Sequence, residues 1–155
     1  MRLYLIQHGQ AKPEAEDPQR ALTLDGEEET KKVAGLAKKM GLNPSQIYHS
    51  GKLRAEQTAA IIGEALDKSL ESAKGLAPLD DVQPWVDKIN QSEKELMLVG
   101  HLPYLEKLAS YLITGDEKIS PVLFRNGAII CLEQKENKKW AVRWVLTPEM
   151  AQNQS

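Results

Sequence analysis

The sequence contains a single cysteine, Cys131, among its 155 residues. A single thiol excludes an internal disulfide framework and a zinc site built from several cysteines, and it fits a reducing compartment. The chain also lacks an excess of one charge, because 20 basic and 22 acidic residues leave a formal net charge of −2. No overall field would hold such a chain on nucleic acid or on an anionic membrane, so any anion site must be local.

Long apolar runs are missing as well, and no stretch reaches the length of a membrane span. The amino terminus, MRLYLIQH, carries one arginine and a very short apolar run, without the features of a secretion signal. We therefore expect a cytoplasmic protein with neither a membrane nor nucleic acid as its partner. A content of 41% hydrophobic residues is enough for one real core. We predict one domain over residues 1–148 and a disordered tail over 149–155.

Strand and helix signals alternate along the chain, which is typical of an α/β fold. Two continuous apolar runs, at residues 3–6 and in ELMLVGH at 95–101, predict central parallel strands that are covered on both faces. The segment QIYHS, 46–50, predicts a shorter strand. Periodic apolar residues predict helices over about 26–40, 53–66, 85–91 and 104–113.

The carboxyl-terminal part has a different pattern. AIICLEQ and WAVRWVL flank the turn-rich KENKK and predict an antiparallel hairpin at the sheet edge. Cys131, Trp140 and Trp144 lie in these alternating segments, and we assign them to packing. The predicted fold is thus a single-domain α/β sandwich, with a mostly parallel central sheet, helices on both faces and an antiparallel edge strand.

Two histidines hold equivalent places in this layout. His8 and His101 each lie just beyond the carboxyl end of a buried strand, and each is next to a glycine. In open α/β sheets this edge is where ligands bind. A lone histidine is more often a satisfied or surface imidazole, but two such strand exits favour a functional site. His49 lacks this context, and we interpret it as structural or surface.

Basic residues fall close to the same edge. Arg54 lies in the first turn of a predicted helix, where free amides already attract anions and a guanidinium adds a planar fork of donors. Arg20 lies in the loop after the His8 strand. Ordinary alternatives are an Arg54–Glu56 ion pair, a loop salt bridge for Arg20 and, favoured for Ser50, a helix N-cap.

Four motifs in order resemble those of the histidine phosphatase superfamily, and within it the small SixA-type phosphohistidine phosphatases. Residues 5–11 match Leu-x-Arg-His-Gly-x-Ala except at Gln7. Residues 50–59 match Ser-x-x-x-Arg-Ala-x-Gln-Thr-Ala, and residues 99–103 match Val-Gly-His-Asn-Pro except at Leu102. The phrase Arg-Pro-Leu-Thr-x-x-Gly is matched from Arg20 to Gly26 except at Ala21. The resemblance covers nearly the whole chain and implies a phosphoglycerate mutase-like fold.

The resemblance also implies roles for individual residues. His8 would be the nucleophile that forms a covalent phosphohistidine, and Arg54 and Arg20 would hold the phosphoryl oxygens. His101 would be a further donor to the phosphate, with Gln7 in the place of the motif arginine. Gly9 would let the backbone pass close to the phosphate. Neither a cofactor nor a metal would be required.

No carboxylate offers a defensible general acid, because Asp80 and Asp81 match no motif and are best interpreted as solvated loop acids. This matters less for phosphohistidine, whose imidazole can be protonated before it leaves. A chain of this length also has no room for a long lid. We therefore predict hydrolysis of phosphohistidine in proteins, with small phosphomonoesters as an alternative within the same chemistry, in a phosphorelay or phosphotransfer setting that the resemblance makes plausible.

A second hypothesis follows from Gln7. Loss of the motif arginine could leave a phosphate-binding or phosphoprotein-binding module with little or no turnover. A third hypothesis, a domain whose histidines are merely structural, is the least favoured because of the paired strand exits.

Overall fold

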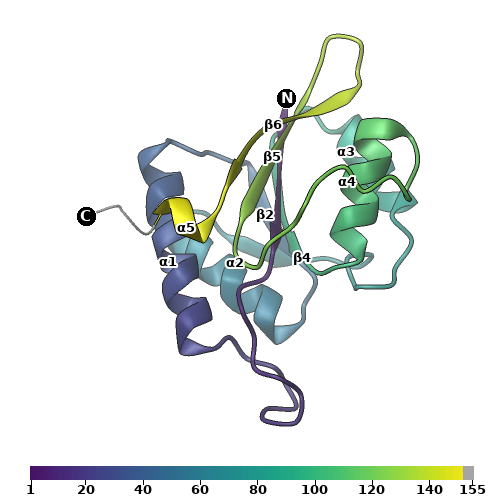
Figure 1. The fold of residues 1–155 in the computed structure, drawn as a ribbon. Coiled ribbons are helices and arrows are strands. Elements are labelled where there is room, and N and C mark those ends of the chain that lie inside the picture. Colours follow the sequence, from purple (N-terminus) through teal and green to yellow (C-terminus); the bar gives the residue numbers. More distant parts are fainter. Residues whose placement is uncertain (152–155) are drawn as a thin grey trace.

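The computed structural model describes residues 1–151 and places a six-stranded sheet between two layers of helices (Figure 1). The strand order is β3-β2-β4-β1-β5-β6. The four strands β1 to β4 are parallel, and β5 runs antiparallel to both β1 and β6. The strands are β1 (Arg2–Gln7), β2 (Gln46–His49), β3 (Leu70–Ser72), β4 (Leu96–Gly100), β5 (Ile129–Gln134) and β6 (Trp140–Leu146).

The helices cover the sheet in two groups. On one face lie α1 (Leu24–Lys39), α2 (Leu53–Leu66) and the short α5 (Pro148–Ala151). On the other lie α3 (Gln83–Gln91) and α4 (Tyr104–Thr114). From β1 the chain proceeds to β2 and β3 toward one edge of the sheet, and then returns to β4 at the centre. Because crossovers between parallel strands are right-handed, connections that run in opposite directions put their helices on opposite faces of the sheet. The predicted fold class is confirmed.

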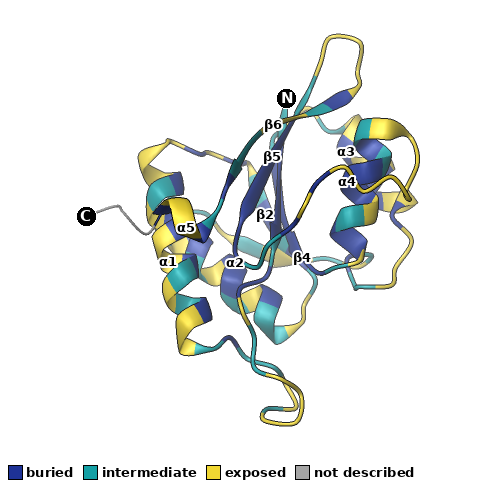
Figure 2. Cartoon of the chain, viewed as in Figure 1, coloured by how far each residue is buried: buried dark blue, intermediate teal, exposed yellow. Residues whose placement is uncertain are grey.

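The central strands β1 and β4 are apolar because both of their faces are covered. Leu3 and Leu5 of β1 pack in the core beneath α3 and α4, whereas Tyr4 and Ile6 pack beneath α1 and α2. In β4 every residue is buried. Figure 2 shows the same contrast across the molecule, with dark central strands and exposed outer helix surfaces. The sheet centre is therefore a rigid base for the loops that follow these strands.

The structure differs from the prediction in a helix start, an additional strand and the start of the tail. Helix α1 begins at Leu24 rather than 26, because the Thr23 hydroxyl caps it by accepting a hydrogen bond from the Gly26 amide at 2.9 Å. The edge strand β3 was not predicted, since its three residues are largely exposed and carry no apolar pattern. The predicted tail also starts too early: residues 149–151 belong to α5, where Ala151 is fully buried against the α1 side.

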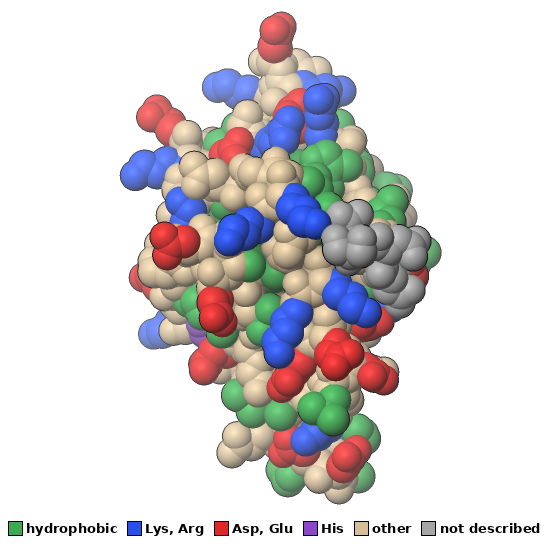
Figure 3. Space-filling model, turned by 90° about the vertical axis from the view of Figure 1, so that its left-hand side faces the viewer, with side chains coloured by type: hydrophobic (Ala, Val, Ile, Leu, Met, Phe, Trp, Pro, Cys, Tyr) green, Lys and Arg blue, Asp and Glu red, His purple; other side chains and the backbone are tan. Residues whose placement is uncertain are grey.

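A helix of four residues is too short to give a periodic signal in the sequence. The remaining residues of the predicted tail, 152–155, lie outside the described residues. Across 1–151, no helix has the length and apolar character needed to cross a membrane. The face seen in Figure 3 carries Lys, Arg, Asp and Glu side chains intermixed, without a field of one sign. Cys131 and Trp140 are buried in the hairpin, and Trp144 packs against Tyr4, so the packing interpretation of these residues is confirmed.

Candidate active site

The two predicted histidines meet at the carboxyl edge of the sheet. Their strands, β1 and β4, are neighbours, and the His8 amide donates a hydrogen bond to the Gly100 carbonyl at 3.0 Å. The ring centroids of His8 and His101 lie 5.2 Å apart. Both residues are buried, with 8% and 1% of their surfaces exposed. The structure thus joins the two strand exits that the sequence placed in equivalent positions.

The tautomer of His8 is set by its own backbone. Nδ1 of the ring lies 2.7 Å from the Gly9 carbonyl oxygen. A carbonyl can only accept, so Nδ1 of the neutral ring must carry the proton. The other nitrogen, Nε2, then has a free lone pair, which is what a nucleophilic imidazole needs.

The electrostatics keep that ring neutral. The pKa of His8 is lowered to about 4, mainly by burial; the hydrogen bond to the Gly9 carbonyl raises it, and the positive charges of Arg54 and Arg20 lower it. At neutral pH the lone pair on Nε2 is therefore available without prior deprotonation.

His101 is oriented by a side chain instead. Its Nε2 lies 2.6 Å from the Ser50 hydroxyl oxygen, which also accepts a hydrogen bond from the Lys52 amide at 3.3 Å. Nδ1 of the ring is buried and makes no hydrogen bond with the described residues. Burial lowers the pKa of His101 to about 3, helped by the charge of Arg54. An oxyanion next to Nδ1 would oppose both effects.

The predicted role of Ser50 as a helix N-cap is wrong. It was interpreted as the N-cap of the Arg54 helix, but α2 is preceded by Lys52 at the cap position, without a side-chain cap bond. The loop turns at Gly51, whose φ of +89° suits glycine, and this extra length moves Ser50 away from the helix end. Its hydroxyl is free to reach His101.

Arg54 lies in the first turn of α2, as predicted. Its Nε is buried and has no hydrogen-bond partner among residues 1–151, and no ion pair with Glu56 occurs there. Burial, and to a lesser degree the charge of Arg20, lower the pKa of the guanidinium from its ordinary value. A buried donor that carries positive charge is well suited to an oxyanion.

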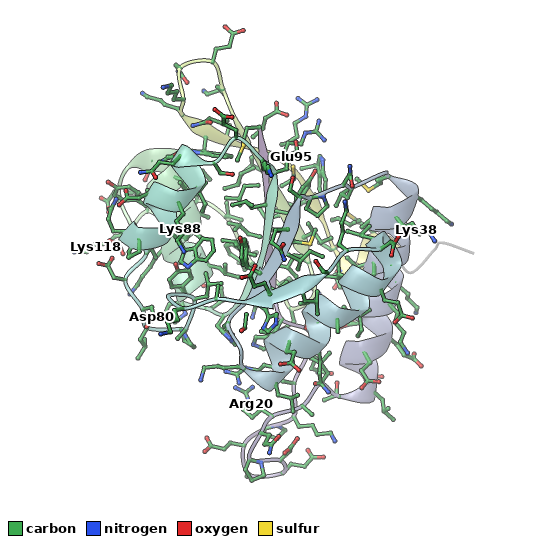
Figure 4. The ribbon with its side chains drawn as sticks, turned by 180° about the vertical axis from the view of Figure 1, so that it is seen from behind. Arg20, Lys38, Asp80, Lys88, Glu95 and Lys118 are labelled. Carbon is green, nitrogen blue, oxygen red and sulfur yellow. The ribbon has the colours of Figure 1, made fainter. Side chains whose placement is uncertain are left out.

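Arg20 lies at the end of the loop that follows β1, and Figure 4 shows it at the end of the molecule below α2. Its backbone has a positive φ of 54°, and its Nε donates to the Lys12 carbonyl at 3.0 Å. Gln57 of α2 fixes the same loop by accepting a hydrogen bond from the Leu22 amide at 2.8 Å. The loop is thus tied to α2, and the two arginines share one region.

Gln7 ends β1 beside Gly100. Its backbone carbonyl accepts from the Gly127 amide at 2.9 Å. The side-chain Oε1 is buried, with no partner among the described residues. An amide can turn either its oxygen or its nitrogen inward. The position of the motif arginine is therefore occupied by a neutral group whose hydrogen-bonding capacity is unused.

Gly9 is held on several sides by the protein itself. Its amide donates to the Thr58 hydroxyl at 2.9 Å, and its carbonyl is engaged by His8, so neither group is free for phosphate. A Cβ at this position would meet Thr30 Oγ1 at 2.8 Å. Glycine is therefore required at this position because the backbone passes close to α1.

Two further contacts hold the segment around His8 and were not predicted. Asn126 donates to the His8 carbonyl at 2.9 Å, and Thr58 receives the Gly9 amide. Thr58 was seen as a motif match without a role. The Asn126-Gly127 dipeptide is a turn signal, but nothing in the sequence shows that this turn returns to the end of β1.

The remaining candidates stay outside the site. Asp80 and Asp81 are exposed and accept local amide hydrogen bonds, from Ala77 and Gln83, as loop acids do. His49 is buried and its Nδ1 accepts from the Gly51 amide at 3.1 Å, which confirms a structural role. Within residues 1–151 no cluster of three or more His, Cys, Asp or Glu side chains is arranged to hold a metal ion.

This arrangement defines an α/β protein with two histidines and two arginines at one sheet edge. The sequence matches the model of the histidine phosphatase superfamily (branch 1) over residues 3–80. An uncharacterized protein of Picosynechococcus sp. is 32% identical over 164 aligned positions, which cover 94% of this chain and 99% of that protein. The chain belongs to the histidine phosphatase superfamily.

Other relatives share this fold over nearly their whole length. Phosphohistidine phosphatase SixA of Escherichia coli is 27% identical over 155 positions, covering 96% of this chain and 94% of that one. A solved structure of the protein histidine phosphatase SixA complexed with tungstate superposes with a TM-score of 0.83, at 26% identity, over 96% of this chain and 97% of the other. The family supports a phosphatase activity for the chain.

Proposed function

We propose that the protein hydrolyses phosphohistidine in other proteins through a covalent phosphohistidine at His8. The observation that carries the proposal is the state of the His8 ring. Its Nδ1 proton is held by the Gly9 carbonyl, and burial keeps the ring neutral, so that Nε2 is ready to attack phosphorus. The His101 ring lies beside it, and the positive charges of Arg54 and Arg20 act on it.

The reaction would have two displacements. In the first, the Nε2 lone pair of His8 forms a bond to phosphorus, while the P–N bond of the substrate breaks and the leaving imidazole takes the electron pair and a proton from solvent. In the second, water attacks phosphorus, the bond to His8 Nε2 breaks, and inorganic phosphate leaves with the water oxygen while the surplus proton is lost to solvent. The ring returns to its starting state.

The charged residues would act on the phosphoryl oxygens. Arg54 Nε and His101 Nδ1 are buried atoms without partners, and an oxyanion would satisfy both. Binding of a dianion would raise the pKa of His101, whose two nitrogens could then donate, one to Ser50 and one to the anion. Arg20 would add a second guanidinium from its loop. The tungstate complex of the SixA relative supports an oxyanion site in this fold. None of these steps requires a metal.

Several observations favour a P–N bond in a protein as the substrate. Asp80 and Asp81 are engaged in their own turn, so neither is placed as an acid for a leaving alcohol. An imidazole can instead be protonated before departure. Beside Arg54 a hollow of about 380 Å³ opens to the surface, lined by Pro18, Gln19 and residues 51–54 and 56. The E. coli relative is named a phosphohistidine phosphatase. We also propose that the protein acts in the cytoplasm, in a phosphotransfer pathway.

One observation favours the second candidate, a phosphoprotein-binding module. Gln7 puts an uncharged amide, with an unpartnered buried oxygen, where the family motif has arginine. Loss of one charged donor weakens the stabilisation of a developing negative charge more than it weakens binding. Arg54, Arg20 and His101 would still hold an anion.

A trapping experiment separates the two candidates. A peptide that carries radiolabelled phosphohistidine is mixed with the protein and quenched in alkali, where phosphohistidine survives. We expect label on the protein within one turnover, followed by free phosphate, and no label on a His8→Asn variant. The matched control is His49→Gln, which removes the third histidine outside the site and should label like the wild type.

Two results would contradict the proposal. Release of phosphate without label on the wild-type protein would exclude the covalent route through His8. Binding of the peptide with neither label nor release would establish the binding module instead.

A further inference from the structure

Thr58 lies on α2, one turn after Arg54, and is fully buried. Its hydroxyl donates to the Arg54 carbonyl at 2.8 Å and accepts from the Gly9 amide at 2.9 Å. One side chain therefore joins the helix turn that carries Arg54, whose Nε is buried, to the residue that follows His8.

The connection continues to the reactive ring. The carbonyl of Gly9, whose amide Thr58 holds, accepts the Nδ1 proton of His8 at 2.7 Å. The other side of Gly9 is confined by α1, since there is no space there even for a methyl group: a Cβ would approach Thr30 Oγ1 to 2.8 Å. With its amide fixed on one side and its Cα confined on the other, Gly9 can present its carbonyl in only one direction.

We propose that Thr58 is a positioning residue for the nucleophile, which aligns His8 with Arg54 by holding the Gly9 amide. This inference rests on the proposed function. In its absence the Gly9 peptide can rotate, the bond from Nδ1 loosens, and the Nε2 lone pair no longer points to one place. An error of about 1 Å in such an alignment can cost on the order of 100-fold in rate.

The chain contains a matched residue that separates positioning from ordinary packing. Thr30 is also fully buried in a helix, and its hydroxyl donates to the carbonyl four residues earlier, Gly26, at 2.7 Å. It borders Gly9 as well. No amide of residues 1–151 donates to it, however, so replacing its hydroxyl by a methyl group leaves no backbone donor without a partner.

The experiment compares Thr58→Val, Thr58→Ser and Thr30→Val with the wild type. The rate constant for phosphorylation of His8 and the KM are measured with the phosphohistidine peptide. Spectra of ¹⁵N-labelled histidine report the tautomer of His8, and thermal unfolding reports stability. We expect Thr58→Val to slow phosphorylation by about 10- to 100-fold, with a nearly unchanged KM and a shift of the His8 nitrogen signals toward mixed tautomers.

Thr58→Ser keeps the hydroxyl and should stay within a few-fold of the wild type, as should Thr30→Val. The inference is overturned if Thr58→Val is no slower than Thr30→Val, if the serine variant is as slow as the valine variant, or if the His8 signals do not change. Failure of the proposed function would be recognised separately, as a wild-type protein without turnover. The nitrogen spectra would still test Thr58 in that case.

Discussion

β1 and β4 lie side by side at the centre of the sheet, and each delivers a histidine next to a glycine. The His8 ring is held by a backbone carbonyl, which can only accept and so fixes one tautomer. The His101 ring is held by the Ser50 hydroxyl, which can either donate or accept. Equivalent strand exits therefore produce two different imidazoles.

The difference suits the two tasks proposed for these histidines. A nucleophile needs a lone pair on a defined nitrogen throughout the reaction, and a fixed neutral tautomer provides it. A residue that stabilises an anion gains from taking up a proton when the anion arrives, and a hydroxyl partner permits both states. The predictions that follow test this division, from the largest expected effect to the smallest.

Removal of each histidine should separate the two tasks most strongly. We expect His8→Ala to lower the single-turnover rate of phosphate release by more than about 10⁴-fold, because the covalent route is lost. His101→Ala should lower it by about 10²- to 10³-fold, since one donor to the phosphoryl group is lost. Hydrolysis of one phosphohistidine peptide by both variants is the measurement, and equal residual rates would show that His8 is not the nucleophile.

Gln7 offers a change in the opposite direction. Arginine at this position restores a charged, forked donor beside the nucleophile. We expect Gln7→Arg to raise the rate constant for phosphate release at least tenfold, or about 1.4 kcal/mol of transition-state stabilisation, with the same fold by circular dichroism. A substitution to lysine is the control for charge without the fork. An unchanged or lower rate in the arginine variant would mean that the site is built around glutamine.

Ser50 should have a smaller effect, through His101 alone. Ser50→Ala removes the hydroxyl from Nε2, and the loss of one hydrogen bond predicts a roughly 3- to 10-fold lower rate. The change should be absent in a His101→Ala background, where the partner is already gone. Ser72→Ala, at the exposed end of the neighbouring strand β3, is the matched control and should have no effect. If Ser50→Ala lowered the rate equally in the wild type and in the His101→Ala variant, Ser50 would not act through His101.

The last prediction concerns stability rather than rate. The pKa of His8 is lowered to about 4 and that of His101 to about 3, so below about pH 6.5 the unfolded chain binds protons that the folded chain does not. The free energy of unfolding should therefore fall as the pH falls from about 6.5 to 4, by up to about 1.4 kcal/mol per pH unit for each histidine. Above pH 6.5 neither contributes to the pH dependence.

Urea unfolding at several pH values measures this slope. His8→Asn should reduce it, and sulfate should reduce it as well, because a bound dianion raises the pKa of the histidines that it contacts. A His49→Gln variant serves as the comparison for a buried histidine outside the site. An identical slope in the wild type and in His8→Asn would show that the His8 ring is not desolvated in the folded protein.

Much of the site follows from local sequence signals. A continuous apolar run predicts a covered central strand, and parallel strands end at the same edge, so His8 and His101 could be expected to converge. Arg54 could be placed in the first turn of its helix by the same reasoning. Ser50 was misjudged because serine before a helix is usually a cap, and only the turn at Gly51 releases it.

The sequence by itself determined which residues could do the chemistry: two histidines at strand exits, two arginines nearby and a glutamine in place of a motif arginine. These are properties of residue type and short-range periodicity, which a linear pattern records. The tertiary structure alone decided how each ring is held: the Gly9 carbonyl holds His8, and Ser50 holds His101. Thr58 and Asn126 in turn hold the backbone of Gly9 and His8. Such contacts join segments 49 to 118 residues apart, except for the one within His8 and Gly9. Their partners are chosen by how the sheet and helices pack, and no local pattern contains that information.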